Sequence, residues 1–502
     1  MTVYNINLGI GWASSGVEYA QAYRSKAFQN RGIDAKFVFM EFISQDNICD
    51  LTRNLGFSDD QVIWLYTFFT DQKIAPTTYT LADLKASFHG QLQKIERDKK
   101  IVKYHYPDQD VFLTAYLKNE EQDIVHRVEY VSRGNLIRKD FFTYTKSFTE
   151  YYTPRDGKAY LYQRRFFNED GSIAFEEIID GNSTIYRTKD FIGYSKESLI
   201  GHFMQKLQLT VSDLVILDRA TGTGQAVFRH VKPAKLAVVV HAEHFSENTV
   251  SDQSILWNNY YEYQFTNADK VDAFLTATDA QKELLAQQFE TYTMHRPKIV
   301  TIPVGSLDHL HYPDGHRQPY SLLTASRLAD EKHVDWLVKA VIAARKILPD
   351  LQFDIYGAGG QEAKLKEIIE TNNAKDYIHL KGHQNLTEVY KTYQLYLTAS
   401  KSEGFGLTLL EAIGSGLPLI GFDARYGNQT FIQEPYNGYV IPKPENDDEE
   451  IIVTAFANKI ITLFKEASLD QMHAYSYQLA EKYLTSNVEK QWQSFVEEMT
   501  HD

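Results

Sequence analysis

A buried strand, a glycine-containing loop, a helix and a second buried strand open this sequence. Residues 3–8 and 35–40 have the character of buried strands, and residues 17–29 between them repeat apolar side chains with helical spacing. The loop before the helix contains Gly9, Gly11 and Gly16. Strand, loop, helix and strand make one turn of a βαβ winding, in which helices cover parallel strands. The sequence therefore predicts an α/β fold.

The alternation of strands and helices returns after Arg187 and begins a second time near Ser321. The predicted strands of these two blocks are 213–218, 236–240 and 270–275, then 321–325, 352–356, 378–381, 395–398 and 417–421. A chain of 502 residues is too long for a single core. We therefore predict two doubly wound lobes that face a cleft. Their expected limits are 1–55 with 205–310 for the first lobe, 311–480 for the second, and 481–502 for a terminal helix that packs back on the first.

Helical spacing disappears between residues 69 and 190. Short runs of alternating apolar and polar residues replace it, separated by turn sequences such as Pro154-Arg155-Asp156-Gly157. This pattern predicts an antiparallel β-meander inserted into the first lobe. Ten aromatic residues lie between residues 141 and 167, so they form either ordinary sheet core or a platform for a partner or acceptor. A basic cluster is expected to be the solvated face of a helix; it contains Lys94, Arg97, Lys99, Lys100 and Lys103.

The composition excludes several classes of protein. Asp and Glu number 66 against 52 Lys and Arg, a net charge of −14, which argues against a nucleic-acid binder. Cys49 is the one cysteine, so neither an intrachain disulfide nor a Cys-rich metal site is expected. Without a secretory leader or a long apolar run, the chain is expected to be soluble and to work in a reducing compartment. Asp108 and Asp110 have an acidic spacing used for metals, but they lie in the meander, so no metal is expected.

The pattern with the most chemical content follows the predicted strand 395–398. Glu403 and Glu411 are eight residues apart, and Gly404 and Gly406 between them let the backbone approach a ligand closely. A helix is predicted directly after Gly406, and its free N–H groups can hold an anionic or hydroxyl-rich ligand. One acidic group in the loop and one in the helix suit a sugar nucleotide, which has many hydrogen-bond donors.

Two cations follow the predicted strand 321–325. Arg327, directly after Ser326, offers a planar fork of donors, and Lys332, further along the same segment, offers a mobile point charge. Together they can neutralise a diphosphate and stabilise it as it departs.

These residues resemble the site of the retaining glycosyltransferases of family four, which have the GT-B fold of two Rossmann-like lobes. In that family an Arg and Lys pair and two glutamates define the nucleotide-sugar site of the second lobe. The resemblance implies that Ser326, Arg327 and Lys332 bind UDP, with Arg327 and Lys332 at the diphosphate. It implies that Glu403 lies beside the donor sugar with Gly404, Phe405 and Gly406, and that Glu411 binds the ribose. It covers residues 1–55 and 205–502.

The resemblance also assigns residues outside these motifs. His383 and Gln384 would seat the uracil, and His241 would meet the donor sugar and join Glu403, Arg327 and Lys332 as catalytic residues. The start of the first helix would face the pyrophosphate; its residues are Gly16, Val17, Glu18 and Tyr19. No second carboxylate is placed as a nucleophile. The family's proposed front-face mechanism is therefore expected, with the developing charge held by Arg327, Lys332 and the Ser15–Gly16 amides.

The inserted meander narrows the resemblance to the subunits that initiate O-glycosylation of serine-rich-repeat adhesins in bacteria with an accessory secretion system. This implies transfer of N-acetylglucosamine from its UDP ester to Ser or Thr of an adhesin. It also implies a cytoplasmic location, with peripheral membrane association left open, and a homologous non-catalytic B subunit bound through the meander. No cofactor or metal is implied. Two alternatives stay open: a non-catalytic acceptor-binding subunit, and a UDP-sugar transferase acting on polysaccharide or glycolipid. Glucose as the sugar also stays open.

Overall fold

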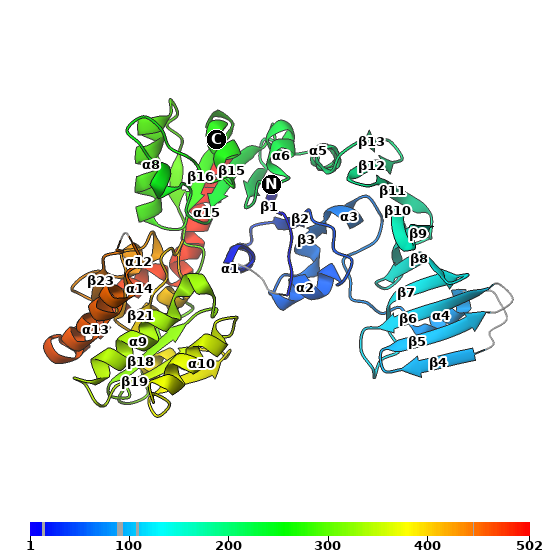
Figure 1. The fold of residues 1–502 in the computed structure, drawn as a ribbon. Helices are drawn as coiled ribbons and strands as arrows, with labels where there is room; N and C mark the ends of the chain where they lie inside the picture. The colour runs from blue at the N-terminus through cyan, green and yellow to red at the C-terminus, as the bar shows by residue number, and fades with distance from the viewer. Residues whose placement is uncertain (13–15, 88–93, 107–109, 445, 502) are drawn as a thin grey trace. The chain divides into compact units, whose positions relative to one another are not determined.

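The computed structural model describes residues 1–12, 16–87, 94–106, 110–444 and 446–501 (Figure 1). The chain forms two compact units. The first contains Met1–Ser25, Ile33–Ala237 and the last few residues, and the second contains Lys26–Gly32 and Val238–Glu498. Strand β15 (Lys235–Val240) crosses from one unit to the other. Both units mix helices with parallel strands, which confirms the predicted α/β class; the predicted domain limits stay predictions.

In the first unit, a parallel sheet of order β14-β1-β2-β3 follows the predicted βαβ winding. Val3 pairs with Leu214 on one side and with Ala35 on the other. The strands are β1 (Val3–Asn7), β2 (Ala35–Phe39), β3 (Val62–Trp64) and β14 (Leu214–Leu217). The helices are α1 (Gly16–Asn30), α2 (Ile48–Asn54), α3 (Leu65–Phe68), α5 (Lys196–Lys206) and α6 (Gly224–His230).

The insertion is an antiparallel sheet in which every strand pairs with the next one along the chain, from β4 to β13, as the meander prediction requires. Helix α4 (Leu81–Ser87) precedes it. The strands are β4 (Lys94–Asp98), β5 (Ile101–Tyr106), β6 (Val111–Leu117), β7 (Val125–Ser132), β8 (Asn135–Phe142), β9 (Lys146–Arg155), β10 (Lys158–Phe167), β11 (Ile173–Asp180), β12 (Ser183–Thr188) and β13 (Ile192–Gly193).

The predicted helix for the basic cluster is wrong, because these residues lie in the hairpin of β4 and β5. Lys99 has a positive φ of 49° in the turn, and Asp98 pairs with Ile101 across it. Strand β5 buries alternate side chains, among them Val102 and Tyr104. The period is therefore two residues, as in a strand, and Lys103, between Val102 and Tyr104, is exposed.

Much of the aromatic density of the insertion is sheet core. A row of phenylalanine rings crosses strands β8 to β11. The ring centroids are 4.3 Å apart for Phe141 and Phe148, and 4.1 Å apart for Phe166 and Phe175. Phe42, from the loop after β2, covers this row and lies 5.2 Å from Phe148. This part of the inserted sheet is therefore buried against the loop that follows β2 of the parallel sheet. A platform on the remaining aromatic residues of the insertion stays a prediction.

The second unit contains a parallel sheet of order β20-β19-β18-β21-β22-β23. The strands are β18 (Ser321–Ala325), β19 (Gln352–Tyr356), β20 (Ile378–Gly382), β21 (Leu395–Thr398), β22 (Leu419–Phe422) and β23 (Gly438–Ile441). Sequential strands extend outward from β18 in one direction and from β21 in the other. The strand order thus reverses between β18 and β21, which pair side by side.

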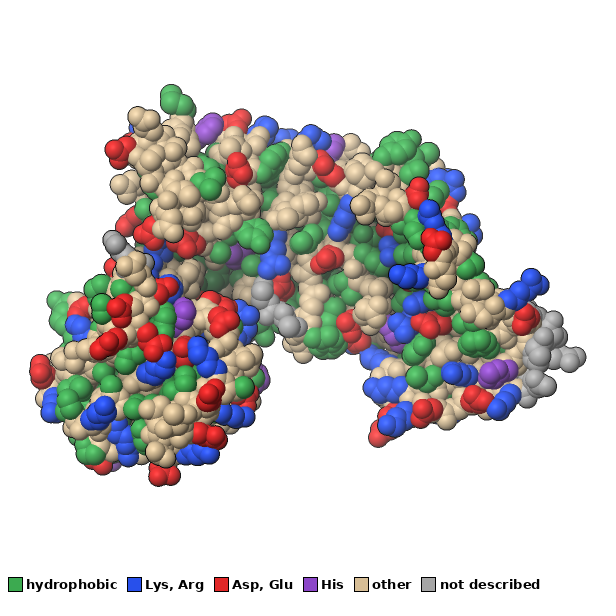
Figure 2. Space-filling model, viewed as in Figure 1, with side chains coloured by type: hydrophobic (Ala, Val, Ile, Leu, Met, Phe, Trp, Pro, Cys, Tyr) green, Lys and Arg blue, Asp and Glu red, His purple; other side chains and the backbone are tan. Residues whose placement is uncertain are grey.

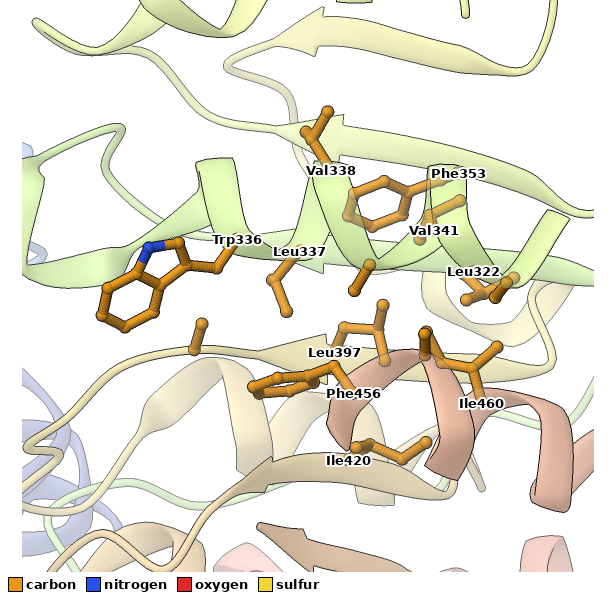
Figure 3. Packing of buried hydrophobic residues seen from close by; sticks show 14 of the residues in the cluster. Leu322, Trp336, Leu337, Val338, Val341, Phe353, Leu397, Ile420, Phe456 and Ile460 are labelled. Atoms are coloured by element: carbon orange, nitrogen blue, oxygen red, sulfur yellow. The ribbon is translucent and has the colours of Figure 1, made fainter. Parts of the chain in front are cut away.

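Two long helices, α9 (Val334–Arg345) and α13 (Glu449–Glu466), bury one face of this sheet. Figure 3 shows their apolar side chains meeting those of the strands; the labelled residues are Leu322, Trp336, Leu337, Val338, Val341, Phe353, Leu397, Ile420, Phe456 and Ile460. Leu337, Phe353 and Phe456 have no exposed surface. This core fixes the positions at which the strands end.

The remaining elements of the second unit are β16 (Ala273–Thr276), β17 (Ile299–Thr301), α7 (Glu262–Thr266), α8 (Asp279–Tyr292), α10 (Glu362–Thr371), α11 (Leu407–Gly414), α12 (Gly427–Phe431), α14 (Leu469–Ala480) and α15 (Thr485–His501). Within α15, Trp492 packs edge-on against Phe28, with ring centroids 5.5 Å apart. Figure 2 shows acidic and basic side chains interspersed over the visible face. Among the residues described, no helix has both the length and the apolar character needed to cross a membrane.

Candidate functional site

The candidate site lies at the reversal of strand order in the second unit. Ligands of open parallel sheets bind beyond the carboxyl ends of the strands at such a point. Lys332 ends the short helix η5 (Asp330–Lys332) after β18, and Glu403 lies in the loop after β21. The Lys332 Nζ lies 2.8 Å from Glu403 Oε2, and the two side chains are only 18% and 24% exposed. The structure therefore joins the two predicted motifs through one partly buried ion pair.

Arg327 lies at the outer rim of this site. Its guanidinium donates to Glu331 Oε1 at 3.0 Å, and its side chain is 78% exposed. Exposed ion pairs of this kind contribute little stability, so the guanidinium can exchange Glu331 for another anion at small cost. Ser326, next to it, is half-buried and bonds the Arg327 carbonyl through its hydroxyl at 3.1 Å.

Glycines bring the ends of β18, β19 and β20 into close contact. A Cβ atom on Gly357 would lie 1.9 Å from the Ser326 carbonyl oxygen, so only glycine allows this approach. The Gly357 N–H also donates to the Gly382 carbonyl at 2.8 Å. The predicted uracil residues His383 and Gln384 follow Gly382 directly and are exposed. The ends of the three strands therefore form one continuous rim beside the ion pair.

The loop of Glu403 packs against the segment that follows β15. A Cβ atom on Gly404 would lie 2.6 Å from the His241 carbonyl oxygen, so His241 and the Glu403 loop are direct neighbours. Gly406 has a φ of 86° and caps helix α11, a conformation that favours glycine. The Phe405 side chain is only 5% exposed and packs against Phe431. Any contact of Phe405 with a sugar must therefore come from its backbone.

Glu411 lies in α11 with most of its carboxyl group buried. Burial raises the pKa of this carboxyl, and the Tyr390 hydroxyl, which donates to Oε2 at 2.9 Å, opposes that rise in pKa. Tyr390 is 1% exposed, so the bond holds the carboxylate in one orientation. Tyr390 could not be predicted from the sequence, because no spacing relates it to Glu411.

The predicted residues of the first helix belong to the first unit. Gly16 is the first residue of α1 and is exposed, as is Tyr19, while Val17 is half-buried. The Glu18 side chain is 4% exposed and accepts from Asn7 Nδ2 at 3.2 Å. It is therefore committed to the interior, and a role of Glu18 in holding pyrophosphate would fall to its backbone N–H. Ser15 lies outside the described residues.

The predicted lack of a metal stays a prediction. Asp108 of the acidic pair in the insertion lies outside the described residues. In the part of the chain that the structure describes, no group of three or more His, Cys, Asp and Glu side chains could hold a metal ion.

The lobe is doubly wound and has a lysine–glutamate pair at its switch point, where the strand order reverses. With a second carboxylate in the adjoining helix, it has the features expected of the nucleotide-sugar lobe of a GT-B glycosyltransferase. Two family models match the chain: the GtfA extended beta-sheet domain over residues 94–190, and glycosyl transferases group 1 over residues 315–478. The first match covers most of the inserted sheet, and the second covers the lobe with the ion pair.

The chain is also similar to several proteins over its whole length. The UDP-N-acetylglucosamine–peptide N-acetylglucosaminyltransferase GtfA subunit of Streptococcus gordonii is 58% identical over 100% of this chain and 99% of its own length. The crystal structure of the pneumococcal O-GlcNAc transferase GtfA with UDP and GlcNAc is 56% identical, with a TM-score of 0.91 over 100% of this chain and 99% of that one. A GtfA/B complex contains a chain 57% identical, with a TM-score of 0.97 over 100% of both. The chain belongs to the GtfA subunit family of glycosyltransferases, which confirms the predicted family and fold.

Proposed function

We propose that this chain transfers N-acetylglucosamine from UDP-N-acetylglucosamine to Ser or Thr hydroxyls of a serine-rich polypeptide, with retention at the anomeric carbon. The observation that carries the proposal is the Lys332–Glu403 pair at the switch point, 2.8 Å apart. It lies in a chain that is 58% identical to a peptide N-acetylglucosaminyltransferase subunit along its whole length.

Each candidate residue has a chemical task in this proposal. Lys332 and Arg327 neutralise the diphosphate as the bond from the sugar C1 to the phosphate oxygen breaks. The acceptor hydroxyl oxygen forms the new bond to C1 on the same face, and its proton passes to the departing diphosphate. Glu403 fixes the sugar beside His241, and Glu411 accepts from the ribose.

We also propose a partner and a location. The solved GtfA/B complex supports a homologous subunit as the partner of this chain. The extended beta-sheet domain, residues 94–190, is the surface proposed for that subunit. The acceptor proposed is a serine-rich-repeat adhesin, modified in the cytoplasm before export. The free thiol of Cys49, which is buried, fits a reducing compartment.

Transfer to a defined polypeptide tests this function. The chain, alone and with its partner subunit, is incubated with a serine-rich polypeptide and radiolabelled UDP-N-acetylglucosamine or, in a parallel reaction, radiolabelled UDP-glucose. A matched polypeptide in which alanine replaces every Ser and Thr is the control. We expect label only in the serine-rich polypeptide. Label confined to lipid or polysaccharide would contradict a protein acceptor, and label from UDP-glucose alone would contradict the sugar.

A further inference from the structure

Ion pairs link two segments of the second unit beside Glu403. One is the segment after His241, and the other is the segment before α12. Arg425 bridges them with its guanidinium fork: one nitrogen lies 3.1 Å from Glu243 Oε1, and the other lies 2.7 Å from Glu247 Oε1. The Arg425 side chain is 20% exposed. Charge-assisted bonds from a planar fork to two carboxylates give this junction a defined geometry.

A buried histidine lies behind this junction. His244 has no exposed surface, its Nε2 lies 2.7 Å from Gln288 Oε1, and its Nδ1 lies 2.9 Å from the Tyr426 hydroxyl. Burial lowers the pKa of His244 to about 4, so the imidazole is neutral near pH 7. A neutral imidazole has one donor and one acceptor. Because Gln288 offers an oxygen, we assign the proton to Nε2, and Nδ1 then accepts from Tyr426.

Backbone hydrogen bonds connect Tyr426 and its neighbours to Glu403. The Tyr426 N–H donates to the Glu403 carbonyl at 2.6 Å, and the Glu403 N–H donates to the Arg425 carbonyl at 2.9 Å. The Gly427 N–H also donates to the Glu403 carbonyl, at 2.7 Å. A Cβ atom on Gly427 would lie 2.1 Å from the Phe405 carbonyl oxygen, so the two loops are in close contact. Glu403 therefore has its backbone fixed on both sides, while its carboxylate meets Lys332.

We propose that Tyr426, held by the His244 ring, is a positioning residue that fixes the Glu403 carboxylate for sugar transfer. The chain of bonds runs from Gln288 in α8 through His244 and Tyr426 to the Glu403 backbone. This inference rests on the proposed function of Glu403. Displacing a catalytic group by about 1 Å can lower the rate about a hundredfold. Buried hydrogen bonds that fix the Glu403 loop therefore affect turnover directly.

Removing the Tyr426 hydroxyl tests the proposal. In Tyr426→Phe the ring can still stack on His244, but Nδ1 loses its donor. We expect kcat for transfer to fall about tenfold, and the Kd for UDP to stay within about twofold, because Glu411 and the strand-end loops are untouched. Two His244 variants refine the test. The amide of Asn can replace Nδ1 as an acceptor for Tyr426, whereas the amide of Gln reaches the Nε2 position. His244→Asn should therefore be more active than His244→Gln, which should behave like Tyr426→Phe.

The control is Tyr477→Phe, which removes a hydroxyl that donates to the His311 and Ser415 carbonyls at 2.8 and 3.1 Å. It should lower the melting temperature without changing kcat of the folded enzyme. A Tyr426→Phe enzyme with unchanged kcat, or an equal fall in the control, would overturn the positioning role. If the wild type itself fails to transfer the sugar, the proposed function is at fault instead.

Discussion

Glu403→Gln is expected to lower the rate of sugar transfer by about 10²- to 10³-fold, the range found when one preorganised electrostatic contact is removed from an active site. Glutamine keeps the size of the side chain but not its charge. The Lys332 ammonium, 2.8 Å from Oε2, would lose the carboxylate that holds it over the switch point. Steady-state transfer from UDP-N-acetylglucosamine to a serine-rich polypeptide measures the effect.

The matched control is Glu449→Gln. Glu449 begins α13 and pairs with Lys339 of α9, so the substitution breaks another lysine–glutamate pair of the same lobe. Its carboxylate is 49% exposed, and we expect transfer within about twofold of the wild type, because exposed pairs contribute little. The account of Glu403 fails if Glu403→Gln retains more than about a tenth of the wild-type rate.

Arg24→Met is expected to lower the free energy of unfolding of the first unit by about 3–5 kcal/mol. Arg24 and Asp218 form an ion pair at 2.8 Å with side chains 1% and 0% exposed. Arg24 also donates to Asn5 Oδ1 at 2.9 Å. Without the guanidinium, the Asp218 carboxylate is left buried without its main counter-charge. Urea unfolding, with the transition of the first unit followed separately, measures the loss.

Lys26→Met on the same helix is the control for this prediction. Lys26 pairs with Asp308 at 3.1 Å, but the two side chains are 57% and 64% exposed. The expected loss is only about 0–1 kcal/mol. Equal losses for Arg24→Met and Lys26→Met would show that burial of the pair does not determine its contribution.

The parallel lobes could be predicted from the sequence because their strands are buried runs between helical stretches. The Glu403 and Lys332 motifs could be found for a similar reason, since each directly follows such a strand. Spacing could not reveal the contacts that orient them. Tyr390 and Glu411 are 21 residues apart, and Tyr426 and His244 are 182 apart, so only the folded chain joins them.

Local sequence also does not show how two groups of residues pack. The lysines of the β4–β5 hairpin resembled a helical face, because a short charged strand at a sheet edge has little apolar alternation. Glu18 and Phe405 fall inside motifs that suggest ligand contact, yet their side chains are 4% and 5% exposed. Which face of a loop or helix a residue occupies depends on packing with distant segments, and a motif alone does not contain that information.

The central claim is that the switch point of the second lobe binds the nucleotide of a UDP-sugar, and calorimetric titration with UDP tests it most directly. The wild-type chain, alone or with its partner subunit, should release heat on binding one UDP per chain. Lys332→Ala should weaken that binding by at least about tenfold, through loss of the cation that meets the diphosphate. No binding heat from the wild type in either state, or equal affinity in Lys332→Ala, would contradict the account.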